Sequence, residues 1–202
     1  MTHYPAARLP HSTTRPTSPA VRFGLAAGSV AGAAVLTAVA AQASVTVPGT
    51  TIPFTLQPVA VLLAGVVLGA RQGALSQVLY LAAGVAGASA FAWSPVLLPG
   101  AARLLGPTGG FLLAFPVAAA VAGLLGDRGV TRGIARTMLA MTAGLVALYA
   151  GGVAWASLFA PAATSAGIVA TFAPYAAADL VKVAVVAPFV PAVRRVLFGA
   201  RP

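Results

Sequence analysis

The chain has no cysteine and only two acidic residues among its 202 residues. The absence of cysteine excludes disulfide bonds and thiolate metal sites. The two histidines, His3 and His11, lie in a polar N-terminal segment and outside every hydrophobic stretch. The sequence therefore gives no indication of a metal or redox centre, and we expect no cofactor.

Charge of either sign is scarce, because charged residues make up 7% of the chain. Soluble domains contain about 25% charged residues. Hydrophobic residues account for 59% of the chain, more than one soluble core of this length can enclose. The composition indicates an integral membrane protein.

Apolar stretches near the roughly 20 residues that cross hydrocarbon occur six times. We expect an all-α bundle of six transmembrane helices in a single domain, residues 21–198, after a disordered polar tail, residues 1–20. The helices are expected at 21–43, 57–70, 72–90, 109–126, 134–160 and 171–198. The second is short, so it either begins within residues 52–56 or is sheltered from lipid by its neighbours, and we expect both to some degree.

Arginine is distributed unevenly between the two sides of this bundle. With both termini in the cytoplasm, the outer loops hold only Arg103. The inner side holds Arg8, Arg15, Arg22, Arg71, Arg128, Arg132, Arg136, Arg194, Arg195 and Arg201. Because cytoplasmic loops collect Lys and Arg, we expect cytoplasmic termini and a multi-pass protein of the plasma membrane. No compact basic face or aromatic array accompanies the charge, so nucleic acid is not an expected partner.

The first apolar stretch has a competing interpretation. The basic tail, the apolar run and Ala41-Gln42-Ala43 are also compatible with a signal peptide and its cleavage site. The run exceeds the about 7–15 residues of a signal core. Its removal would leave five spans and an unbalanced charge distribution, so we favour a membrane helix.

Asp179 and Lys182 are the only charged residues of the last apolar stretch before Arg194. An Asp or Lys at the centre of a membrane helix costs about 2.5–3.5 kcal/mol on insertion scales, so the pair should face protein. Residues three apart share one face of a helix, and both heads then point into one interior volume. This volume is the candidate binding site. The alternative is a structural ion pair that tightens the last helix against the bundle.

Two outward-facing connections have the composition of ordered segments. Residues 44–56 combine β-branched residues with two prolines, which predicts a re-entrant or capping loop. Residues 91–108 carry Trp93 and three prolines and lead into Gly-Pro-Thr-Gly-Gly at 106–110. That segment lacks the lysine and the spacing of a nucleotide-binding loop. Its glycines predict a close approach at the start of the fourth helix, where unpaired amide groups are candidate ligand contacts.

Small residues recur four apart in the first apolar stretch. The pairs are Ala27 and Ala31, Gly28 and Gly32, and Ala34 and Ala38. This spacing lets another helix approach closely in lipid. In a chain so rich in Ala and Gly, packing within the chain is the favoured interpretation.

Four blocks of sequence occur in a characteristic order. They are Ile-Pro-Phe-Thr-Leu-Gln at 52–57, the stretch at 62–87, Leu-Leu-Gly-Pro-Thr-Gly-Gly at 104–110 and Asp-Leu-Val-Lys at 179–182. Together they resemble the BioY family, the biotin-binding S components of energy-coupling factor (ECF) transporters. The similarity extends over residues 21–198, and the order and spacing of the blocks make it specific.

The resemblance implies high-affinity binding of biotin in an outward-facing pocket, and uptake with a membrane-embedded coupling subunit and two ATPases. The residues that it implies or that we place beside this pocket are Thr55, Gln57, Phe91, Trp93, Thr108, Gly109, Phe111, Tyr175, Asp179 and Lys182. It also implies that Ala27 and Ala31 face the coupling subunit. Two departures from the family stand out. Phe111 replaces the usual tyrosine, and Ser-Ala-Phe-Ala at 89–92 replaces the usual Pro-Val-Phe-Ala.

The chemistry of biotin suits the charged pair. Asp179 can accept from the ureido N–H groups, and Lys182 can donate to the ureido carbonyl or to the ligand carboxylate. For Tyr80, Tyr149 and Tyr175 we expect ordinary packing or an interfacial position, although Tyr175 lies one turn before Asp179 on the face toward the same cavity. An interfacial position is also the alternative for Trp93. Another small vitamin or organic anion is the alternative ligand. An enzyme is not expected, because no acid or base pair accompanies a nucleophile.

Overall fold

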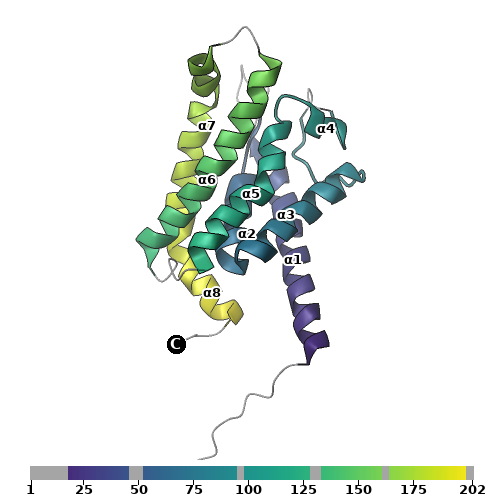
Figure 1. The fold of residues 1–202 in the computed structure, drawn as a ribbon, viewed down its shortest axis with the longest axis vertical. Coiled ribbons are helices and arrows are strands. Elements are labelled where there is room, and N and C mark those ends of the chain that lie inside the picture. The colour runs from purple at the N-terminus through teal and green to yellow at the C-terminus, as the bar shows by residue number, and fades with distance from the viewer. Residues whose placement is uncertain (1–17, 46–51, 95–97, 128–132, 161–163, 199–202) are drawn as a thin grey trace, which may run out of the picture.

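The computed structural model describes residues 18–45, 52–94, 98–127, 133–160 and 164–198, and this part of the chain is nearly all helical (Figure 1). The α-helices are α1 (Pro19–Gln42), α2 (Gln57–Leu68), α3 (Ala70–Val85), α4 (Ala102–Leu105), α5 (Gly109–Asp127), α6 (Ile134–Ala156), α7 (Ser165–Val186) and α8 (Val190–Phe198). Two 3-10 turns, η2 (Ser157–Phe159) and η3 (Ala187–Phe189), extend α6 and α7. Strands β1 (Ser44–Val45) and β2 (Phe54–Thr55) pair antiparallel.

Four described helical stretches are long and apolar enough to cross a membrane. They are Pro19–Gln42, Gly109–Gly126, Ile134–Phe159 and Ala166–Leu197. At the second and third predicted positions lie α2 and α3, with 12 and 16 residues. At 1.5 Å per residue these helices are about 18 and 24 Å long, shorter than the about 30 Å of hydrocarbon. The fold is that of a helical membrane protein in which α2 is largely buried among its neighbours, whereas α3 keeps an exposed apolar face with Leu75, Val78 and Leu79.

For α2 we expected both an earlier start within residues 52–56 and shelter by neighbouring helices, and the structure shows only the shelter. The helix begins at Gln57, directly after β2, so it does not extend into residues 52–56. Nine of its 12 residues are buried. It ends at Gly69, whose φ of 87° suits glycine and lets α3 turn back along α2.

The last predicted helix is divided in the structure. It begins earlier than predicted, at Ser165, where the side chain of Thr164 accepts from the amide of Gly167 at 3.1 Å. Pro188 and Pro191 have no amide hydrogen to continue the helical ladder, and the α-helix gives way to η3 before α8.

The centre of the bundle is α5, which lies between α6 on one side and α2 and α3 on the other (Figure 1). Glycines allow this close packing. A Cβ at Gly65 would overlap the backbone of Ala119, and one at Gly123 would overlap the backbone at Ala70. The backbones of α2, α3 and α5 are therefore in direct contact at these two glycines.

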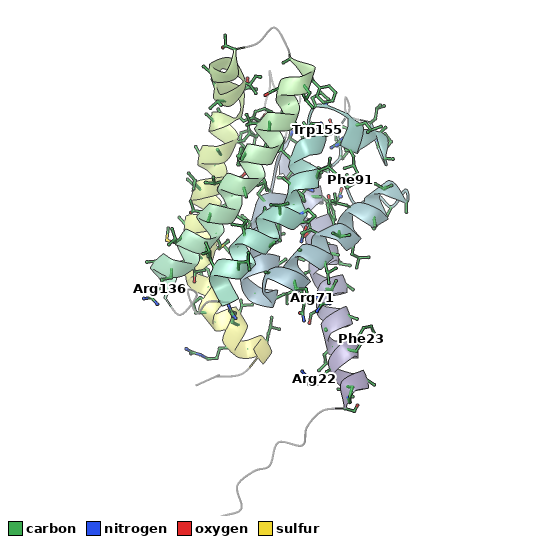
Figure 2. All side chains as sticks on the ribbon, in the orientation of Figure 1. Arg22, Phe23, Arg71, Phe91, Arg136 and Trp155 are labelled. Carbon is green, nitrogen blue, oxygen red and sulfur yellow. The ribbon has the colours of Figure 1, made fainter. Side chains whose placement is uncertain are left out.

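The arginines mark one end of the bundle. Arg22, Arg71 and Arg136 lie toward the end where α1 begins and α8 ends, whereas Phe91 and Trp155 lie toward the other end (Figure 2). The opposite end also carries α4, with Arg103 (Figure 1). Residues 1–17, which include most of the predicted tail, and the arginines at 8, 15, 128, 132 and 201 lie outside the described residues.

Candidate functional site

A cavity lies among the helices and includes Arg103 of α4 in its lining. Its walls come from β2 and from α2, α4, α5, α6 and α7, together with the chain that follows α3. Its apolar lining consists of Ile52, Pro53, Phe54, Pro58, Phe91, Ala92, Phe111, Leu112, Phe115, Leu148 and Phe172. Its polar lining consists of Thr55, Gln57, Arg103, Thr108, Tyr149, Tyr175, Asp179 and Lys182. Apolar walls with a few convergent polar groups are typical of a small-molecule site.

The charged pair faces this cavity from α7. Lys182 Nζ lies 2.7 Å from Asp179 Oδ1, and the Tyr149 hydroxyl donates to Asp179 Oδ2 at 2.7 Å. Asp179 is buried, while the Lys182 side chain is 22% exposed. Both carboxylate oxygens are therefore engaged by donors, which is how a buried carboxylate is stabilised.

The segment before α2 covers the cavity and is attached to α7. Lys182 Nζ donates to the carbonyl oxygen of Thr55 at 2.8 Å, and the Tyr175 hydroxyl donates to that of Ile52 at 2.8 Å. The rings of Phe54 and Tyr175 stack with centroids 4.1 Å apart. We call residues 52–55 the roof of the cavity. Part of the predicted capping loop thus lies over the site, and its residues 46–51 lie outside the described residues.

Gln57, the first residue of α2, lines the cavity next to residues 52–55 and is held by hydrogen bonds to its neighbours. Its Nε2 donates to the Tyr80 hydroxyl at 2.6 Å, and its Oε1 accepts from Thr55 Oγ1 at 3.3 Å. The Tyr80 hydroxyl in turn donates to the carbonyl oxygen of Ala90 at 3.3 Å. Tyr80 is buried and packs in the core, so it supports a residue of the lining without being part of it.

Arg103 is a second cation of the cavity, which sequence reasoning treated only as a loop charge. Its Nη2 donates to the carbonyl oxygen of Ala92 at 2.6 Å, and the residue is buried. Burial lowers the pKa of Arg103 from its ordinary value, and Tyr80 partly opposes this. A signal was present in the sequence, because this arginine stands alone on the side that arginine otherwise avoids.

Tyr149 also lines the cavity, although the sequence analysis did not place it at the site. Its hydroxyl contacts Asp179, and its ring meets Phe111 edge-on with centroids 5.5 Å apart. A phenol inside an apolar helix needs a hydrogen-bond partner, and Asp179 is one of only two acids in the chain. These two facts could have suggested the pairing.

The start of α5 contributes Thr108 and Phe111 to the lining, but not Gly109. A Cβ at Gly109 would overlap the backbone of Leu104, and one at Gly110 would overlap Trp155, so the predicted close approach is present. The Gly109 amide donates to the carbonyl oxygen of Gly106 at 2.9 Å. It is therefore not the unpaired ligand contact that we expected.

The connection after α3 places its two aromatic residues differently. The Phe91 ring lines the cavity, fits against Gly84 and meets the Tyr80 ring with centroids 5.6 Å apart. Trp93 is 69% exposed and does not line the cavity. Its position fits the interfacial alternative.

The small residues of α1 divide into two groups. Ala34 is buried, and Thr37, on the same part of the helix, accepts a hydrogen bond from Gln77 of α3 at 3.2 Å. Ala27 and Ala31 are exposed, and a Cβ at Gly28 would meet nothing within 4 Å. Packing within the chain therefore uses the second half of α1 and leaves the first half open.

Comparison with known proteins gives a consistent family. The model of the BioY family matches residues 20–198. A probable biotin transporter BioY from Pyrococcus horikoshii is 38% identical over 149 residues, which cover 74% of this chain and 83% of that protein. A biotin transporter BioY from Thermotoga maritima is 35% identical over 143 residues, 71% of this chain and 81% of that protein.

A solved structure has a similar fold. It is the S-component for biotin from an ECF-type ABC transporter, with a TM-score of 0.76 and 19% sequence identity. The match covers 89% of this chain and 95% of that one.

Proposed function

The chain belongs to the BioY family, and from this premise we propose that it binds biotin and takes it up as the substrate-binding S component of an ECF transporter. The observation that carries the proposal is the Asp179–Lys182 pair, which faces a largely apolar cavity that also contains Arg103. Two charged side chains in a membrane helix raise the free energy of insertion unless they bind a polar ligand or make a structural contact.

The cavity offers a complement to each part of biotin. Aromatic walls suit the fused rings, and Asp179 suits the ureido N–H groups. Lys182 uses two of its three donors, on Asp179 and on Thr55, which leaves one for the ureido carbonyl or for the carboxylate. Arg103 adds a planar guanidinium, which matches a carboxylate well. Two cations and one anion balance a ligand with a single negative charge.

We infer a membrane arrangement with six passes and both termini in the cytoplasm. The four long helices cross the membrane completely, and the short helices α2 and α3, of which α2 is buried along most of its length, form the remaining two passes. Placing the arginine end inside follows the preference of cytoplasmic loops for Arg and Lys. The cavity then opens outward from the plasma membrane, where biotin is captured.

We infer that binding of biotin alters the contacts of the roof. Residues 52–55 are attached to α7 through Lys182 and Tyr175, which are also residues of the cavity lining. A ligand that engages Lys182 therefore competes with, or rearranges, the contacts that hold the roof. Capture of the ligand and closure of the roof are linked through one side chain.

The chain needs partners for active transport, because it has no phosphate-binding loop. We propose a coupling subunit and two ATPases, with docking at Ala27 and Ala31 of α1, which are exposed. Replacing both alanines with tryptophan should prevent copurification with the coupling subunit. Leu25→Trp is a matched control, since Leu25 is 65% exposed but lies about 200° around the helix from Ala27. An intact complex in the double variant would contradict this placement.

The binding proposal is tested on purified protein with a ligand panel of biotin, desthiobiotin, thiamine and riboflavin. We expect saturable binding of biotin. Asp179→Asn should weaken it at least about tenfold, because a hydrogen bond to a charged group contributes about 1.5–3 kcal/mol. Arg71→Ala, at the opposite end of the bundle, is the control. Binding of a different panel member in place of biotin would support the alternative vitamin, and unaltered affinity in Asp179→Asn would assign the pair to the scaffold.

A further inference from the structure

The cavity wall after α3 is held by side chains rather than by secondary structure. Residues 89–92 are neither helix nor strand, and they include Phe91 and Ala92 of the lining. The carbonyl oxygen of each of these four residues accepts from a side chain. Tyr80 of α3 donates to Ala90, and Arg103 of α4 donates to Ala92. Three helices thus determine where this wall lies.

The remaining two carbonyl oxygens are bound by one residue of α1. Gln42 Nε2 donates to Ser89 O at 3.2 Å and to Phe91 O at 3.3 Å. It also lies 3.4 Å from Ala38 O of its own helix. Gln42 is the last residue of α1 and is exposed, so it touches the wall from outside and not through the cavity.

The position of Phe91 makes this contact consequential. Its ring fills the space beside Gly84, where a Cβ would overlap it, and forms part of the cavity surface. Its backbone carbonyl is held from α1, whereas its two neighbours are held from α3 and α4. A shift of α1 relative to α3 therefore acts on Ser89 and Phe91, and of these two residues only Phe91 lines the cavity.

We propose that Gln42 is a positioning residue that connects α1 to the cavity wall and thereby couples the position of α1 to ligand retention. The inference rests on the proposed function, because the ligand in its test is biotin. Coupling between two sites is reciprocal. Whatever binds the open first half of α1 and displaces the helix changes ligand affinity through this contact, and the bound ligand resists that displacement.

Variants at residue 42 separate the donor from the shape of the side chain. Gln42→Met keeps the length but has no donor, whereas Gln42→Lys keeps a donor able to reach both carbonyl oxygens. We expect the dissociation constant of biotin to rise about three- to tenfold in Gln42→Met, mainly through faster release, and to stay within about twofold in Gln42→Lys. Ser29→Ala is the control, since Ser29 donates only within α1, to Leu25 O.

A spectroscopic measurement tests the contact without any ligand. The chain has two tryptophans, so 5-fluorotryptophan labelling gives two fluorine resonances, and Trp93→Phe assigns the one next to the wall. In Gln42→Met the Trp93 resonance should narrow and shift, while in Ser29→Ala and Gln42→Lys it should stay at the native position. The proposal is overturned if Gln42→Met keeps both the native Trp93 resonance and the native biotin affinity. It is also overturned if Gln42→Lys loses as much biotin affinity as Gln42→Met does. If the native protein fails to bind biotin, the proposed function fails, and the resonance still decides whether Gln42 holds the wall.

Discussion

Removal of the Lys182 charge should separate ligand binding from structural stability. Lys182→Met keeps the length of the side chain but removes the partner of Asp179 Oδ1 at 2.7 Å and the donor to Thr55 O at 2.8 Å. The carboxylate would then retain only the Tyr149 hydroxyl. Breaking a fully buried pair costs about 3–5 kcal/mol, and an exposed pair contributes about 0–1 kcal/mol.

The expected magnitude lies between these limits. Asp179 is buried but the Lys182 side chain is 22% exposed, so water reaches part of the pair. We expect Lys182→Met to lower the free energy of unfolding by about 2 kcal/mol. The double variant with Asp179→Asn removes the unpaired charge as well, and most of that loss should be recovered.

Biotin binding should not recover in the same way. Both single variants and the double variant lack part of the charged recognition, so each should bind at least about tenfold more weakly than the native protein. The assays are unfolding in mixed micelles by titration with sodium dodecyl sulfate, and equilibrium binding of labelled biotin to the same preparations. Native affinity in the stable double variant would refute the reasoning and leave the pair with a structural role alone.

Two further predictions concern the cavity. Arg103→Gln should weaken binding of biotin about tenfold more than binding of biotinol, because only biotin presents a carboxylate to the guanidinium. The two affinities are measured by competition, and equal losses would show that Arg103 does not recognise the carboxylate. Gly84→Ala should displace the Phe91 ring and reduce both biotin affinity and the melting temperature, because the added Cβ would overlap that ring. Gly32→Ala is the matched control, since a Cβ there meets nothing within 4 Å, and equal behaviour of the two variants would show that Phe91 can move at no penalty.

The helical stretches could be read from the sequence because long apolar runs have few alternatives in a membrane protein. The break before α8 was missed for a related reason. Prolines such as Pro188 and Pro191 are common in membrane helices, and the apolar run continues through them. Only the packed structure shows that the helix does not continue there.

Helical periodicity predicted only the part of the candidate site whose residues lie close together in the sequence, and the family resemblance supplied distant residues such as Gln57, Phe91 and Phe111. Asp179 and Lys182 are three residues apart, and helical periodicity alone places them on one face. Arg103 and Tyr149 reach the same cavity from α4 and α6, and such contacts between distant segments leave no periodic pattern. Trp93 was wrongly expected in the wall because an aromatic residue suits both a pocket and an interface, and only its exposure distinguishes the two.

The main-chain contacts of residues 89–92 have an evolutionary consequence. A carbonyl oxygen is present whatever amino acid carries it, so this stretch can change its own side chains while the donors at Gln42, Tyr80 and Arg103 preserve its path. Substitutions at the exposed Ser89 should therefore be tolerated better than substitutions at the three donors, whereas the buried Ala90 leaves no room for a larger side chain. The path of this stretch is thus specified by residues that lie outside it, on α1, α3 and α4.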